Sequence, residues 1–92
     1  MTDAVRVRIE GRVQGVGYRA WLARQAQKSG LRGWVRNRLD GSVEALLIGE
    51  TAAVEDVIAA CWHGPRPASV SAVHRSADSD DGSSGFRHLP TE

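Results

Sequence analysis

VRVRIEGRVQGVGYR, residues 5–19, contains two different patterns in succession. Apolar and charged residues alternate from Val5, and this period of two is typical of a strand that is buried on one face. Three glycines then interrupt the alternation, and good helix formers follow from Ala20 to Lys28, until Ser29-Gly30 supplies a stop. The residues Val5, Val7, Ile9 and Val13 share one side of the strand. The sequence therefore predicts a strand, a loop and a helix, in this order.

The middle of the chain predicts a hairpin and a second helix. Leu31–Arg38 is rich in Trp and Val, Ser42–Ile48 is a second extended and mostly apolar run, and the turn signal Asp40-Gly41 lies between them. Thr51 is a suitable N-cap for a helix that Gly64-Pro65 would end. Apolar residues recur in it at i, i+3, i+4 and i+7, the spacing of one buried helix face. These residues are Val54, Val57, Ile58 and Cys61.

The last part of the chain predicts a strand over Val70–Arg75 and a short one over Phe86–Leu89. Ser76–Gly85 is almost wholly Ser, Asp and Gly, so we expect a mobile turn with too little apolar surface to order itself. The whole order is strand, helix, strand, strand, helix, strand, with a short extra C-terminal strand. It predicts an α+β fold of the ferredoxin-like, split βαβ type, with two helices on one face of a mostly antiparallel sheet. Residues 1–92 are expected to form a single domain.

Composition limits the function classes. The net charge is only +1, but residues 1–40 carry nine Lys/Arg against three Asp/Glu, and residues 41–92 carry three against eight. A basic half favours a small anionic ligand or nucleic acid. The single cysteine excludes an internal disulfide, and no Cys/His spacing fits a zinc site. No secretion signal and no apolar run of about twenty residues is present, so we expect a cytoplasmic location and no membrane partner.

The loop Gly11–Arg19 is a candidate anion site. It lies between a strand and a helix start, where free backbone N–H groups and the helix dipole favour an anion, and Gly15 and Gly17 allow the backbone to curl. Arg19 adds a planar, permanently charged fork that suits phosphate oxygens. A Walker A loop is excluded because Gly17 is followed by Tyr18-Arg19, and the GxGxxG fingerprint is absent. The loop has no Cys, Ser or Asp nucleophile, so hydrolysis at this site would use water directly.

GRVQGVGYR at 11–19, followed by Gly33-Trp-Val-Arg-Asn37 and Asp40-Gly-Ser-Val-Glu44, resembles the two signature segments of the acylphosphatase family. The resemblance implies a hydrolase that cleaves the carboxyl-phosphate bond of acyl phosphates and releases inorganic phosphate. It also implies that Arg19 grips the phosphate and that Asn37 positions the attacking water. The phosphate cradle would be the backbone N–H groups of Gln14, Gly15, Val16, Gly17, Tyr18 and Arg19. We expect no metal, no cofactor and a monomer.

Alternatives remain at this point. The same element order occurs in RNA-binding modules, but these display aromatic residues on central strands, and here the first strand presents Arg and Glu outward, so we expect no nucleic-acid partner. A non-catalytic phosphate-binding domain, or an acylphosphatase-like domain specific for carbamoyl phosphate, would keep the same loop. His63, His74 and His88 are expected to have surface or structural roles, and Cys61 is expected to be a small hydrophobe on the apolar face of the second helix. Trp21, Trp34 and Trp62 are expected to be packing residues. No catalytic role is expected for any of these seven. Asp78, Asp80 and Asp81 are expected in a solvated loop that tolerates substitution.

Overall fold

The computed structural model describes all residues, 1–92, and contains five strands and two helices. The elements are β1 (Thr2–Arg12), α1 (Tyr18–Lys28), β2 (Arg32–Asn37), β3 (Val43–Glu50), α2 (Thr51–Cys61), β4 (Ser69–Ala77) and β5 (Phe86–His88). Every predicted element is present. The sheet order is β4-β1-β3-β2-β5, and all pairs are antiparallel except β2 with β5. This is the predicted α+β, ferredoxin-like arrangement.

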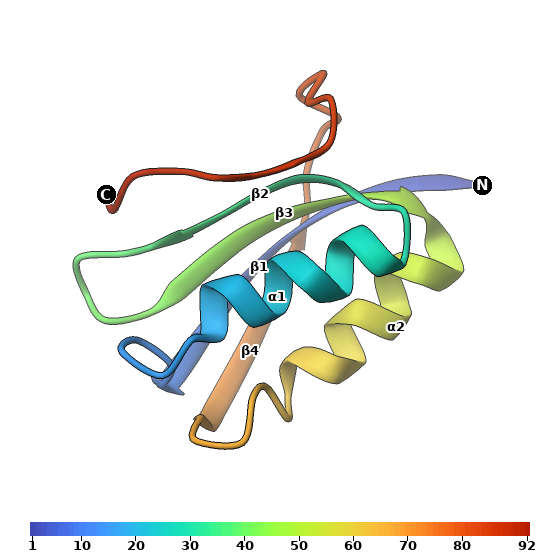
Figure 1. The fold of residues 1–92 in the computed structure, drawn as a ribbon. Coiled ribbons are helices and arrows are strands. Elements are labelled where there is room, and N and C mark those ends of the chain that lie inside the picture. Colours follow the sequence, from blue (N-terminus) through green and yellow to red (C-terminus); the bar gives the residue numbers. More distant parts are fainter.

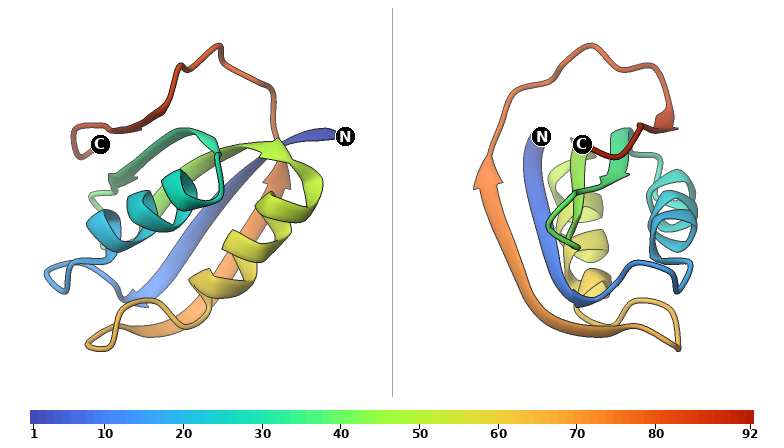
Figure 2. Two further views of the ribbon diagram at one scale, coloured as in Figure 1. Left: turned by 45° about the vertical axis from the view of Figure 1, so that its right-hand side comes forward. Right: turned by 90° about the vertical axis from the view of Figure 1, so that its left-hand side faces the viewer.

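Both helices lie on the same face of the sheet, and the opposite face carries no helix (Figure 1). The sheet seen nearly edge-on shows the two layers clearly (Figure 2). Neither helix, each of 11 residues, has the length and apolar character that crossing a membrane requires.

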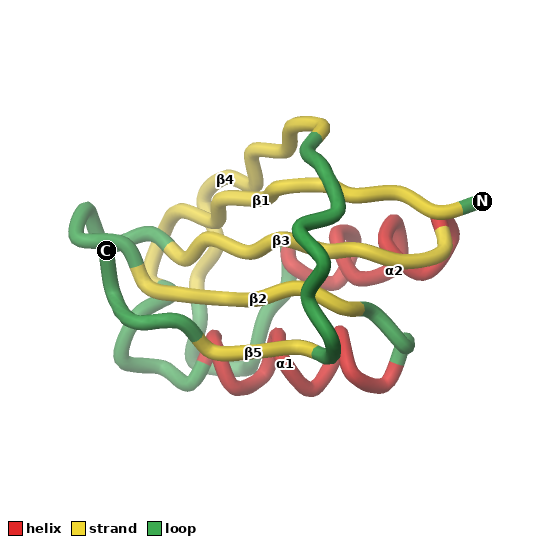
Figure 3. Tube along the Cα trace, turned by 90° about the horizontal axis from the view of Figure 1, so that it is seen from above, coloured by secondary structure: helices red, strands yellow, loops and turns green.

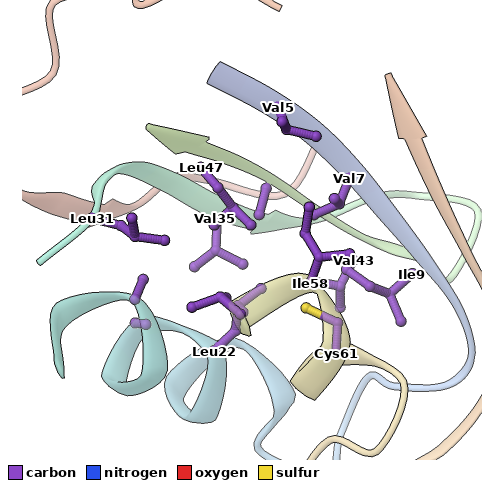
Figure 4. Packing of buried hydrophobic residues seen from close by; sticks show 14 of the residues in the cluster. Val5, Val7, Ile9, Leu22, Leu31, Val35, Val43, Leu47, Ile58 and Cys61 are labelled. Carbon is purple, nitrogen blue, oxygen red and sulfur yellow. The ribbon is translucent and has the colours of Figure 1, made fainter. Parts of the chain in front are cut away.

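The main core fills the space between the two layers (Figure 4). Val5, Val7 and Ile9 of β1 point into it, as the alternation predicted, because successive strand residues face opposite sides. The apolar face of α2 packs against them, with the thiol of Cys61 fully buried. Burial of these side chains supplies the main stabilisation, at about 25 cal/mol per Å² of apolar surface.

A smaller apolar cluster lies on the open face of the sheet, which is the face without helices. Trp34, Leu46 and Ile48 form it. The guanidinium groups of Arg6 and Arg36 lie 5.5 and 4.8 Å from the centre of the Trp34 ring, within cation–π range. Trp34 is therefore a packing residue, as predicted.

The prediction of a mobile turn at Ser76–Gly85 is wrong. β4 continues to Ala77, and the following loop crosses the open face of the sheet from β4 to β5 (Figure 3). Asp78 pairs with Arg6 at 2.7 Å, and Asp80 pairs with Arg32. Ion pairs and hydrogen bonds hold this polar segment, so it does not depend on apolar burial for order.

Two smaller expectations are also corrected. Thr51 does not cap α2: it is the first helical residue, and its hydroxyl donates to the carbonyl of Met1 at 3.2 Å. Trp62 is 51% exposed at the end of α2. It is therefore a surface residue and contributes little to packing.

Candidate active site

A hollow of about 220 Å³ lies where β1 ends and α1 begins. Its volume is smaller than the roughly 300–1,000 Å³ of pockets for drug-sized ligands, so it suits a small guest. β2 and β5 each contribute one residue to its wall. The nine lining residues are Val13, Gln14, Gly15, Gly17, Tyr18, Arg19, Ala20, Asn37 and His88. None of them carries a carboxylate.

The backbone of the loop presents a continuous run of free donors. No N–H group from Gln14 to Ala20 donates to another group of the protein, and the first to do so is that of Trp21, to the carbonyl of Gly17 at 3.0 Å. The first N–H groups of any helix lack intrahelical acceptors, and here the preceding loop extends that set. These donors and the positive end of the helix dipole together favour an anion.

Glycine is required for the curl of this loop. Gly15 has φ +74°, and Gly17, at the N-cap of α1, has φ +80°. Both values lie in the left-handed region, which residues with a Cβ rarely adopt. A Cβ at either position would meet nothing within 4 Å, so backbone conformation, and not space inside the protein, demands glycine.

Arg19 lies in the first turn of α1 and lines the hollow. Six other arginines each lie close to a carboxylate; they are Arg6, Arg8, Arg32, Arg36, Arg38 and Arg75. Arg19 has no such partner and is only partly buried. Its guanidinium is therefore available for an external anion, for which its planar fork is well suited.

Asn37 is the last residue of β2 and lines the same hollow. Its side-chain oxygen Oδ1 is the one buried side-chain polar atom in the chain without a hydrogen-bond partner. Buried polar atoms are normally satisfied, so a buried acceptor without a partner in a residue that lines the hollow is unusual. The structure thus brings Arg19 and Asn37, 18 positions apart in the sequence, to one hollow.

The other predicted loop residues have distinct roles. The Gln14 side chain donates from Nε2 to the carbonyls of Arg38 and Ser42, each at 2.8 Å, so it ties the loop to the β2–β3 hairpin. Val16 packs against the core and does not line the hollow. The Tyr18 ring is buried, and burial raises the pKa of its hydroxyl far above the ordinary value. The side chains of Gln14, Val16 and Tyr18 therefore hold the loop, and their backbone N–H groups remain free.

His88 was expected to be a surface or structural residue, and it is exposed. The sequence did not show that it also lines the hollow. It lies on the wall of the hollow, although it is far along the chain from the loop residues that also line it. The parallel pairing of β5 with β2 aligns His88 with Val35, two residues before Asn37. No local pattern could have shown this, because the position depends on the register between two distant strands.

The geometry supports recognition of a tetrahedral anion. Loop residues with free N–H groups, Arg19 without a carboxylate partner, and Asn37 line one hollow that contains no carboxylate. Fixed donors of this kind stabilise charge that develops on a transferring group.

Comparisons with known proteins agree with this chemistry. The acylphosphatase family profile matches residues 5–88. An acylphosphatase of Rhodopseudomonas palustris is 60% identical over 74 residues, which cover 79% of this chain and 75% of that protein. The structure of an acylphosphatase from Coxiella burnetii superposes with a TM-score of 0.92 at 32% identity, covering 96% of this chain and 93% of the other.

A second solved structure gives the same result. The acylphosphatase from Bacillus subtilis superposes with a TM-score of 0.90 at 34% identity, covering 97% of this chain and 99% of that one. The two signature segments and the fold thus agree with the comparisons, and this chain belongs to the acylphosphatase family, whose members are hydrolases of acyl phosphates.

Proposed function

We propose that the hollow holds the phosphoryl group of an acyl phosphate, with Arg19 and the amides of Gln14–Arg19 as its ligands. The free N–H groups and the unpaired guanidinium support this assignment. Both kinds of donor stabilise negative charge on the equatorial oxygens as the phosphoryl group transfers. Phosphoryl transfer of this type needs positioning and electrostatic stabilisation more than covalent chemistry.

Asn37 positions the attacking water in this proposal. Asn37 lines the hollow, and its side-chain amide, which can donate and accept, hydrogen-bonds the water and holds it against the phosphorus. A neutral amide is no base near neutral pH, so the water proton passes to a phosphate oxygen or to solvent. The leaving group is a carboxylate whose conjugate acid has a pKa near ~4, so no strong general acid is needed.

One observation carries the proposal: a buried acceptor without a partner lies on the same hollow as an arginine without a carboxylate. Either feature alone is compatible with an ordinary surface. Together they provide one ligand for the anion and one for the nucleophile.

The test is hydrolysis of an aromatic acyl phosphate by the purified protein in excess chelator. Arg19→Gln removes the guanidinium and is expected to lower kcat/KM by about 10²- to 10³-fold and to weaken inhibition by inorganic phosphate. Asn37→Ala is expected to lower kcat by about 10²-fold while phosphate still binds. Arg24→Gln is the matched control, because Arg24 lies exposed on the same helix and does not line the hollow.

Two outcomes would contradict the assignment. Retained turnover in Asn37→Ala would exclude its role in placing water, and equal losses in Arg24→Gln and Arg19→Gln would indicate a general charge effect. Turnover of carbamoyl phosphate beside acetyl and aromatic acyl phosphates distinguishes a carbamoyl-specific domain from a general enzyme. Phosphate binding without turnover of any of them would leave a non-catalytic phosphate-binding domain.

We further infer that the enzyme acts without a metal, as a monomer in the cytoplasm. The donor set supports the first point, because a hollow lined by a guanidinium and amide N–H groups attracts anions and repels cations. Undiminished turnover in chelator tests it. Light scattering at working concentration tests the monomer, and fractionation of the native host tests the location.

A further inference from the structure

His88 is the one lining residue of the hollow that the proposed mechanism does not use. β5 pairs in parallel with β2, which aligns Phe86 with Gly33 and His88 with Val35. Phe86 packs against the main core, so it faces the helices. Residues two apart share a face of a strand, and His88 therefore faces the helix side, beside Asn37 and Arg19.

None of the residues that line the hollow with His88 carries a carboxylate side chain. The elements packed against β5 are β2 and α1. Asn37 of β2, which is uncharged, and Arg19 of α1 line the hollow. Tyr18, the remaining titratable lining residue, keeps its hydroxyl buried against the carbonyl of Cys61. Glu92 lies near β2, but its side chain pairs with Arg36 on the open face.

The other two histidines differ. His74 lies on β4, and its Nε2 is 2.5 Å from Oε2 of Glu10. His63 follows the end of α2 and lines no hollow. Only His88 lies where a bound anion would provide its negative partner.

We propose that His88 is a proton-dependent second cation of the anion site, so that a dianion binds together with a proton. The inference rests on the proposed function, which makes the hollow a phosphoryl site. Histidine is the side chain that ordinarily changes charge between pH 5 and 8. A bound dianion favours the charged imidazolium over the neutral ring. Binding and protonation at His88 therefore strengthen each other by the same factor.

The consequence is a site whose affinity depends on pH. A guest that stays dianionic is held more tightly as pH falls through the histidine range. The neutral ring at higher pH leaves Arg19 and the loop amides as the only donors. His88 acts in this scheme on affinity, and the attacking water stays with Asn37.

The probe for the test is sulfate, a tetrahedral dianion that, unlike phosphate, does not titrate between pH 5.5 and 8. We expect calorimetry to show sulfate binding about three- to tenfold tighter at pH 5.5 than at pH 8, with proton uptake near pH 7. In NMR the His88 ring resonances should titrate at higher pH with sulfate than without it. His63 and His74 should titrate alike in both samples.

Two variants and a control complete the design. His88→Gln is expected to bind sulfate with little dependence on pH. His88→Lys, charged throughout this range, should bind at pH 8 about as tightly as the parent does at pH 5.5. His74→Gln serves as the matched control and should keep the parental pH dependence.

The failures are distinguishable. An unchanged pH dependence in His88→Gln, or a His88 titration that sulfate does not move, would overturn the inference while leaving the anion site intact. Absence of sulfate and phosphate binding at every pH would overturn the proposed function and the inference with it.

Discussion

The backbone and the side chain of Tyr18 have different roles. Its N–H belongs to the run of free donors in the hollow. Its ring is buried and packs on Trp21 with a centroid distance of 5.2 Å, and its hydroxyl donates to the carbonyl of Cys61 at 2.7 Å. The first residue of α1 is therefore fixed to the last residue of α2, which holds the mouth of the loop in place.

Tyr18→Phe tests that anchor. Without the hydroxyl, the buried carbonyl of Cys61 loses its partner, and an unsatisfied buried acceptor costs about 1–3 kcal/mol. We expect a loss of that size in the free energy of unfolding, measured by urea denaturation. Turnover should change little, since the backbone N–H is retained. A variant with unchanged stability but lost turnover would instead give the hydroxyl a catalytic role.

Cys61 makes the protein sensitive to alkaline pH. Burial raises the pKa of its thiol from 9.0 to about 11. The unfolded thiol ionises first, so stability is complete below pH 9 and is lost as pH rises toward 11. We expect a loss of about 2–3 kcal/mol from this group across that range, in urea titrations. The Cys61→Ala variant should lose less unfolding free energy over the same pH interval. An equal loss in the variant and the parent would show that Cys61 is not the source of the alkaline sensitivity.

At the scale of elements, Gln14 connects the loop to the β2–β3 hairpin. Its Nε2 donates to the carbonyls of Arg38 and Ser42, one on each side of the turn. Asn37 lies directly before Arg38, so the two halves of the site are joined through this one side chain. In the proposed mechanism, the distance between the bound phosphoryl group and the attacking water depends on that connection.

Gln14→Ala is therefore expected to affect both stability and rate. Two hydrogen bonds to neutral groups are lost, which lowers the free energy of unfolding by about 1–3 kcal/mol. Displacement of the loop from Asn37 should lower kcat by at least about tenfold. Gln27→Ala, on an exposed face of α1, is the matched control and should change neither quantity. Parental kinetics in Gln14→Ala would show that the loop keeps its position by other contacts.

Local pattern explains which elements could be predicted. The apolar spacing in α2 placed Val54 and Ile58 in the core because helix periodicity is decided within a few residues. The loop after β4 could not be predicted in the same way. Its ordering carboxylates, Asp78 and Asp80, meet arginines that are 72 and 48 positions away in the sequence.

The residues of the candidate site also differ in whether local sequence could predict them. Arg19 and the loop glycines belong to one contiguous segment, whose chemistry was readable before the fold was known. Asn37 required the family resemblance, because a strand-end asparagine beside a turn signal is otherwise unremarkable. His88 depended on strand register, and its place at the hollow followed only from the structure.

At the scale of the whole molecule, the two faces of the sheet are stabilised differently. The helix side is a continuous apolar core. The open face holds a small apolar cluster under paired charges, and Glu44, only 7% exposed, lies within reach of Arg6, Arg36 and Arg38. Networks of this kind retain more of their interaction energy than isolated surface pairs.

The loop over the open face makes stability depend on acid. The hydrogen bond from Arg32 holds the pKa of Asp80 below its ordinary value of 3.8, and the N–H of Ser79, followed by Arg6, does the same for Asp78. A carboxylate with a lowered pKa stabilises the fold at pH values above its ordinary pKa. This stabilisation is lost as pH falls through the pKa in the folded protein, so the urea concentration at the unfolding midpoint should decrease once the pH is below about 4. Asp80→Asn should show a smaller difference between pH 6 and pH 3 than the parent, and 1 M salt should reduce that difference. Asp56 is an exposed carboxylate on α2, and Asp56→Asn is the control that should keep the parental acid dependence. If Asp80→Asn also kept the full parental acid dependence, the loop would not be the cause of the acid response.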